Sequence, residues 1–224
     1  MPNWCENTLD IYGEEDEMDR FYEFFGGIEL SPPLLTLKDK IVRQLNKVTS
    51  KLGFIIISHR TNFDKPVTKF EKNFNFNHIL PTPKELENTT SPVRIISQED
   101  YDKTQELYKK HGKKNAWDLF NKDKISKEEQ GLMFQNGITQ EISDRLKSEY
   151  GCDNWYTWAN NNWGTKWDID KISLNNLDTY SCSFNFKTAW GSPIPIINKL
   201  KEMFPNLDIN GYYLGEGNEF AGVF

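Results

Sequence analysis

The chain has 224 residues, of which 37% are hydrophobic and 27% are charged, and its formal net charge is −6. This length and composition predict one elaborated globular domain and exclude extensive disorder and a collagen-like repeat. No apolar stretch approaches the roughly 18 to 20 residues of a membrane span, and the N-terminus lacks the basic and apolar regions of a signal peptide. We therefore expect a cytoplasmic protein without membrane contact.

The N-terminal region predicts a strand followed by a helix. Residues 4–12 alternate large or apolar with polar side chains and end at Gly13, a pattern typical of a half-buried strand and a turn. Acidic residues at 14–17 follow, which suits the first turn of a helix because they oppose its dipole. An apolar face then runs over residues 18–25 before two glycines end the helix.

Charge is unevenly distributed along the next part of the chain. Residues 1–27 contain eight acids and one base, whereas residues 38–72 contain nine bases and three acids. A basic cluster can attract phosphate. However, the bases between Lys38 and Lys51 surround apolar residues at helical spacing, which is typical of the solvent face of an ordinary amphipathic helix. We therefore do not expect a nucleic-acid partner.

A second strand is predicted at residues 73–79. Phenylalanine and isoleucine alternate there with asparagine, and Pro81 follows, where proline ends a ladder of hydrogen bonds. A candidate short strand also lies at residues 54–57.

A helical, Trp-rich insertion is expected over residues 84–175. From 84 to 150 the composition is rich in lysine, glutamate and aspartate, with helical patterns near 99–111 and 138–150. Residues 154–168 then hold four of the seven tryptophans. The alternative is a separate helical domain over 84–150, which would need two linkers.

The C-terminal region predicts a strand, a helix and two more strands. Residues 181–188 alternate, and the helix that follows would have Ser192 as its N-cap and Pro193 in its first turn. Apolar residues over 207–214 indicate a further strand, and residues 220–224 could pair with it.

This order of elements predicts an α+β fold: a ferredoxin-like split βαβ antiparallel sheet with two helices on one face. Exposed sheet edges make a homodimer plausible.

Several segments also carry a resemblance to a known family. They are Met1–Asn7, Phe76–Pro83, Trp163–Asp168, Thr188–Trp190 and Tyr213–Gly217. In these segments the chain resembles the YubB-type ferredoxin-like family of phage and plasmid genomes. The resemblance implies the ferredoxin-like fold and a mobile-element origin. The family has no assigned function, so the resemblance implies no catalytic residue.

Cysteine and histidine usage does not fit the common metal and disulfide patterns. Cys5, Cys152 and Cys182 are odd in number and far apart, with no C-x-x-C pair and no histidine at ligand spacing. No nucleophile motif and no phosphate-cradling loop is present. We therefore predict no cofactor, no metal and no catalytic residue, and the sequence favours a binding protein over an enzyme.

The tryptophans of the insertion form the main candidate site. Trp155, Trp158, Trp163 and Trp167, here called the Trp cluster, combine flat apolar rings with nearby amides and one lysine. Such residues can stack a planar ring, read its edges and meet a phosphate. The alternative is that the same rings form core. The candidate ligand-binding residues are Trp158, Asn160, Trp163, Thr165, Lys166, Trp167, Asp168, Trp190, Glu216 and His78.

Three of these candidates have simple structural alternatives. Trp190 precedes a helix N-terminus that could hold an anion, or it could only brace the prolines that follow. Glu216 could accept a ligand hydrogen bond, or belong to a hairpin turn. His78 could act as a general acid or base, or have no chemical role.

Three functions remain open. The first is a non-catalytic phage or mobile-element protein that holds a small planar, nucleotide-like ligand and so sequesters a host defence signal. The second is a protein-interaction module that binds a host protein through the acidic first helix or the insertion. The third is a nucleotide-processing enzyme with His78 or Asp168 as base. The fold does not choose among them.

Overall fold

The computed structural model describes residues 3–27, 69–112, 119 and 124–224. The predicted basic helix around Lys38–Lys51 and the candidate strand at 54–57 lie outside these residues. None of the helices in the described ranges is long and apolar enough to cross a bilayer.

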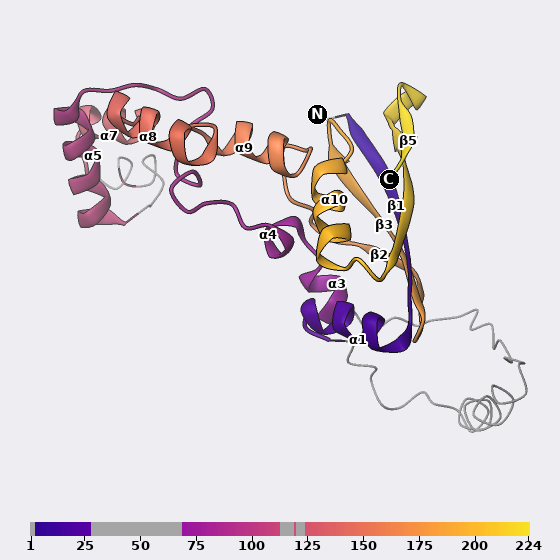
Figure 1. The fold of residues 1–224 in the computed structure, drawn as a ribbon. Coiled ribbons are helices and arrows are strands. Elements are labelled where there is room, and N and C mark those ends of the chain that lie inside the picture. The colour runs from indigo at the N-terminus through magenta and orange to yellow at the C-terminus, as the bar shows by residue number, and fades with distance from the viewer. Residues whose placement is uncertain (1–2, 28–68, 113–118, 120–123) are drawn as a thin grey trace, which may run out of the picture.

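A five-stranded antiparallel sheet is the centre of the fold, and its strand order is β2-β3-β1-β4-β5. Helices α1 and α10 cover one face of this sheet (Figure 1). The first four strands with these two helices have the predicted ferredoxin-like topology, and β5 extends the sheet as a hairpin. The bounds are β1 Trp4–Tyr12, α1 Glu15–Phe24, β2 Ser173–Leu177, β3 Ser181–Ala189, α10 Ile194–Met203, β4 Asp208–Gly215 and β5 Ala221–Val223.

The alternation in the central strands decides which side chains are buried. Leu9 and Ile11 of β1 pair with Phe184 and Cys182 of β3, and all four are buried in one core with the apolar faces of α1 and α10. The residues between them face the other side, as period-2 alternation requires. The predicted strands at 4–12, 181–188, 207–214 and 220–224 and the first helix are confirmed.

The predicted strand at 73–79 is wrong. This segment forms two short helices, α3 (Lys69–Asn73) and α4 (Phe76–Ile79), and α4 begins where the Asn75 side chain accepts a hydrogen bond from the His78 backbone N–H. An asparagine cap competes with extended backbone. The second strand of the ferredoxin-like core is β2, whose ladder with β3 contains a register shift between Leu174 and Asn176. Because of this register shift, the sequence of β2 lacks the regular alternation of apolar and polar residues that would indicate a strand.

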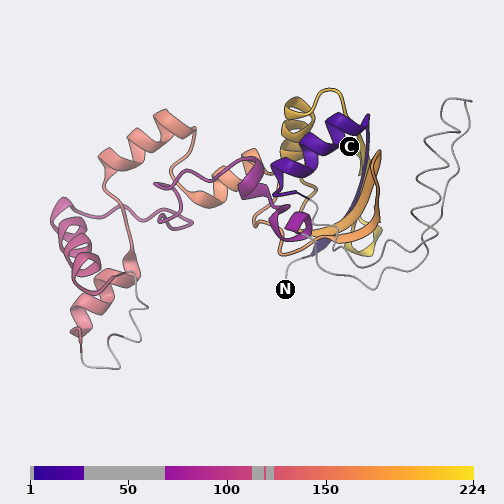
Figure 2. The ribbon, with the colours of Figure 1, turned by 90° about the horizontal axis from the view of Figure 1, so that it is seen from below.

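The helical insertion is present between α1 and β2. The predicted helices near 99–111 and 138–150 are confirmed as α5 (Gln98–His111) and α8 (Gln140–Tyr150). The structure adds α7 (Lys127–Gln135), which a Ser126 and Glu129 capping box begins, and α9 (Trp155–Asn162). Helices α5, α7 and α8 lie away from the sheet (Figures 1 and 2). Leu107 of α5 and Met133 of α7 form a small separate core with Leu119 and Ile125. Leu146 of α8 belongs to the main core.

The expected start of the C-terminal helix needs correction. Pro193 is the N-cap of α10, Pro195 lies in its first turn, and no side chain caps the helix. The Ser192 hydroxyl is buried and has no hydrogen-bond partner among the described residues. Because the helix begins one residue later than expected, the N-cap is Pro193, which has no side-chain acceptor, and not Ser192.

Candidate ligand-binding site

The structure divides the Trp cluster into buried and accessible rings. Trp158 and Trp163 are only 5% and 6% exposed and pack edge to face with ring centroids 5.5 Å apart. The Trp163 indole N–H donates to the Leu80 carbonyl at 3.0 Å, and its ring lies against Phe76. A buried indole with a satisfied N–H is a stable core residue. These two rings join the insertion to the sheet and are not accessible to a ligand.

Trp155, with residues outside the Trp cluster, lines a surface hollow of about 490 Å³ that we call the aromatic cleft. Trp167 is 42% exposed but is not one of its lining residues. The lining of the cleft comes from four parts of the chain: the loop before the first insertion helix, the start of α9, the loop after α9 and the connection from β3 to α10. The lining residues are Ser91, Trp155, Tyr156, Lys166 and Trp190.

Lys166 brings a positive charge into the aromatic cleft. Its ammonium nitrogen lies 4.4 Å from the Trp167 ring centroid and 5.7 Å from the Tyr156 ring centroid, within the range of cation–π attraction. Within the described ranges no carboxylate forms an ion pair with Lys166. The positive charge is therefore held by aromatic faces and stays available to an anion.

Trp190 is held in the cleft by an uncommon backbone conformation. Its φ is 71°, in the left-handed region that a bulky residue rarely adopts, while its side chain is 54% exposed. Its backbone N–H donates to the Asn3 carbonyl at 2.9 Å, which continues the pairing of β1 with β3 by one residue. Such strain persists only where the surroundings enforce it, and it often marks a functional position.

Gly164 allows the loop that carries Lys166 to approach α10. Its φ is 82°, and a β-carbon there would lie 2.6 Å from the Pro195 ring and 2.7 Å from the Ser192 carbonyl oxygen. Only glycine fits this position. Next to it, the Thr165 hydroxyl is buried and donates to the Ala189 carbonyl at 2.8 Å. These contacts place Lys166 beside the β3 to α10 connection that carries Trp190.

Four further predicted site residues, besides Trp163 and Thr165, have structural bonds and do not line the cleft. The Asn160 amide donates to the Tyr156 carbonyl at 2.7 Å within α9. His78 Nε2 lies 2.8 Å from the Phe24 carbonyl, and its ring packs against Phe24. Glu216 accepts the Trp4 backbone N–H at 3.0 Å in the β4 to β5 hairpin.

Asp168 has the most extensive structural role among these four. Its carboxylate accepts the backbone N–H groups of Phe76 at 2.7 Å and Asn77 at 3.0 Å, which are free at the start of α4, and that of Ile169 at 2.8 Å. It therefore joins the Trp-rich segment to the segment at 73–79.

Three cleft residues are not among the ten candidate ligand-binding residues: Trp155, Tyr156 and Ser91. Trp155 belongs to the Trp cluster and Tyr156 adjoins it, so the composition of this segment indicates both. Ser91 lies more than sixty positions earlier, in a polar stretch with no distinguishing pattern. Only the packing of α9 against the loop that contains Thr89, whose hydroxyl accepts the Trp155 backbone N–H at 3.0 Å, brings it to the site.

The titratable groups of the described structure do not form a reactive cluster. No group of three His, Cys, Asp or Glu residues that could hold a metal occurs within the described ranges. Burial raises the pKa of the Cys5, Cys152 and Cys182 thiols, so all three stay protonated at neutral pH. These thiols are weak nucleophiles and weak ligands in the folded protein.

Comparison with known proteins supports the fold of the C-terminal part. Residues 162–224 match the family model described as the ferredoxin-like domain in Api92-like protein. Among solved structures, the crystal structure of protein Api92 from Yersinia pseudotuberculosis is similar to this chain at 12% identity and a TM-score of 0.36, covering 100% of this chain and 93% of that one. No curated protein matches the chain.

Proposed function

We propose that this protein is a non-catalytic binding protein whose aromatic cleft holds a planar, anionic ligand of the nucleoside phosphate class. The observation that carries the proposal is the position of Lys166, a cation without a carboxylate partner in the described structure, among the accessible rings of one hollow.

The lining of the cleft suits the two parts of such a ligand. A base can stack on an exposed indole, and stacking is worth about 1 to 3 kcal/mol per base. The Lys166 ammonium can meet a phosphate as a point charge. The hollow of about 490 Å³ lies within the usual range of small-molecule sites. Its five lining side chains include no carboxylate, imidazole or thiol, so binding without turnover is the simplest use of this site.

The resemblance to phage and plasmid proteins supports a biological setting for this binding. A mobile element benefits from a protein that lowers the free concentration of a host signal nucleotide in the cytoplasm. Such a protein needs affinity and abundance rather than catalysis. We therefore propose that the protein sequesters such a nucleotide.

Binding can be tested by thermal shift and tryptophan fluorescence against a panel of mono-, di- and cyclic nucleotides. A ligand at one hundred times its dissociation constant stabilises the folded state by about 2.7 kcal/mol, which raises the melting temperature by roughly 5 to 10 °C for a chain of this size. Quenching should accompany the shift because Trp155 and Trp190 line the cleft.

Two variants locate the site. Lys166→Met keeps the apolar stem and removes the charge, and we expect it to weaken binding at least tenfold. Lys171→Met is the matched control, because Lys171 is exposed and does not line the cleft. The proposal is refuted if no nucleotide changes the melting temperature or the fluorescence, or if both variants bind as the wild type does.

A further inference from the structure

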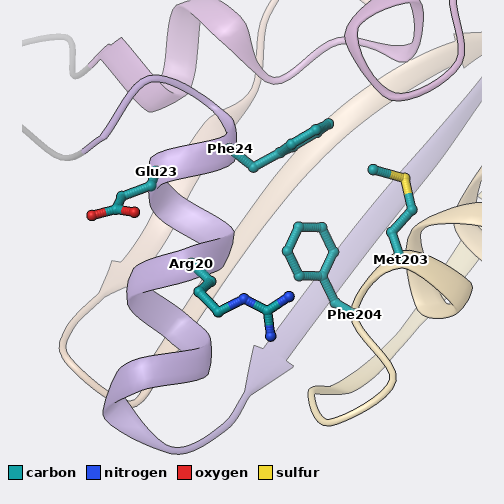
Figure 3. Close-up of a pocket in the computed structure, with 5 residues that line it drawn as sticks. All are labelled: Arg20, Glu23, Phe24, Met203 and Phe204. Carbon is teal, nitrogen blue, oxygen red and sulfur yellow. The ribbon is translucent and has the colours of Figure 1, made fainter.

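A second hollow lies on the helical face of the fold, between α1 and the end of α10. We call it the helix groove. It has a volume of about 500 Å³ and is lined by Arg20, Glu23, Phe24, Met203 and Phe204. Figure 3 shows Phe24, Met203 and Phe204 around the hollow, Arg20 extending toward Phe204, and Glu23 pointing outward from α1.

The floor of the helix groove is apolar and supported from below. Phe204 is buried, and its ring packs edge to face against Phe24 at 5.7 Å and against the fully buried Phe21 at 5.2 Å between centroids. Phe24 also packs against His78 at 4.8 Å. Phe24 and Met203 are half-buried and form the accessible part. Rigid rings beside one adaptable methionine suit a surface that receives apolar side chains.

Helix α1 carries more acids than bases beside the groove, and of these acids Glu23 alone is a lining residue. The single base, Arg20, is bound by the Glu17 carboxylate at 2.8 Å, so its charge is largely neutralised. Asp16, Asp19 and Glu23 are exposed, and no described base forms an ion pair with them. Asp16 and Asp19 lie one turn from Arg20 and Glu23, respectively, on the same side of the helix. The negative electrostatic potential of these acids therefore favours a cationic partner at the groove.

The two flanking helices define the shape of that partner. Helices α1 and α10 have ten residues each, which is about 15 Å or three turns. A third helix packed against such a pair places apolar residues at i, i+3 or i+4, and i+7 in the hollow. Its flanking positions then face the acids of α1.

We infer that the helix groove is a docking site for a basic amphipathic helix of a partner protein. This site is distinct from the aromatic cleft, which shares no lining residue with it, and the inference does not depend on the proposed ligand.

The probe is a labelled peptide of about four helical turns with leucine at i, i+3, i+4 and i+7 and lysine at the remaining positions. Its binding to the full chain is followed by fluorescence anisotropy. A second peptide has the same leucines and glutamate in place of lysine. We expect the lysine peptide to bind and the glutamate peptide to bind at least tenfold more weakly.

Charge-matched variants separate the groove from general attraction to an acidic protein. The double variant Asp19→Lys with Glu23→Lys should weaken binding of the lysine peptide at least tenfold. The double variant Glu87→Lys with Glu106→Lys changes the net charge equally at exposed sites outside the groove. It should weaken binding of the lysine peptide by less than about threefold.

Met203→Lys tests the apolar floor with little risk to the core, because this side chain is only half-buried. This variant should also weaken binding of the lysine peptide at least tenfold. The inference is overturned if the two peptides bind equally, if the two charge variants lose equal affinity, or if Met203→Lys binds as the wild type does. Lys166→Met should leave peptide binding unchanged, so failure of either proposal is recognised separately.

Discussion

Replacement of Asp168 should damage the fold rather than a ligand site. Its carboxylate receives backbone N–H groups of Phe76 and Asn77, which begin α4, at 2.7 and 3.0 Å. Hydrogen bonds to a charged group contribute about 1.5 to 3 kcal/mol each, and loss of a helix cap typically costs about 1 kcal/mol. Because Asn77 is exposed and water can replace its bond, we expect Asp168→Ala to lower the free energy of unfolding by about 2 to 3 kcal/mol.

Urea unfolding followed by circular dichroism measures this loss, which corresponds to a melting temperature roughly 5 to 10 °C lower. Asp168→Asn keeps one oxygen acceptor and should lose about half as much. Asp170→Ala is the control, since Asp170 is exposed and should change stability by less than about 0.5 kcal/mol. Unchanged stability in Asp168→Ala together with lost nucleotide binding would refute the structural role and return Asp168 to the site.

Two further predictions concern the sheet and its core. Gly211→Ala should destabilise the fold by about 2 to 3 kcal/mol, because a β-carbon would collide with the Thr8 carbonyl oxygen of β1. Gly131→Ala, where the β-carbon meets open space in α7, should be neutral or stabilising. Equal unfolding midpoints for the two variants would contradict this reasoning. Burial raises the pKa of both Cys182 and Tyr22 above their unfolded values of about 8.5 and 10, so the protonated forms are favoured in the folded state. The contribution of these two groups to stability should therefore be constant below about pH 8 and fall above it, by up to about 1.4 kcal/mol per pH unit for each group past its unfolded pKa. Urea midpoints in Cys182→Ala should fall less between pH 8.5 and 10.

Strands with one buried face were predictable from the sequence, and segments positioned by distant contacts were not. The strands β1 and β3 pair with each other over nine residues. Burial alternates along β1 and along β3 up to Thr188 because one face meets the helices. Phenylalanine and asparagine also alternate at 73–77, yet the carboxylate of Asp168, about ninety residues later, stabilises the start of a helix there. A local pattern cannot report a partner so far along the chain.

The candidate site shows the same division. Composition by itself determined that the tryptophans, amides and lysine of residues 154–168 form an unusual segment, and the alternating strands determined the antiparallel sheet. Only tertiary packing decided which rings are buried, since Trp163 finds the Leu80 carbonyl for its N–H while Trp190 remains exposed on a strained backbone. The aromatic cleft combines residues 91, 155, 156, 166 and 190. Local propensity acts over a few residues, whereas burial depends on the surfaces that the folded chain brings together, and this is why the cleft emerged only from the three-dimensional structure.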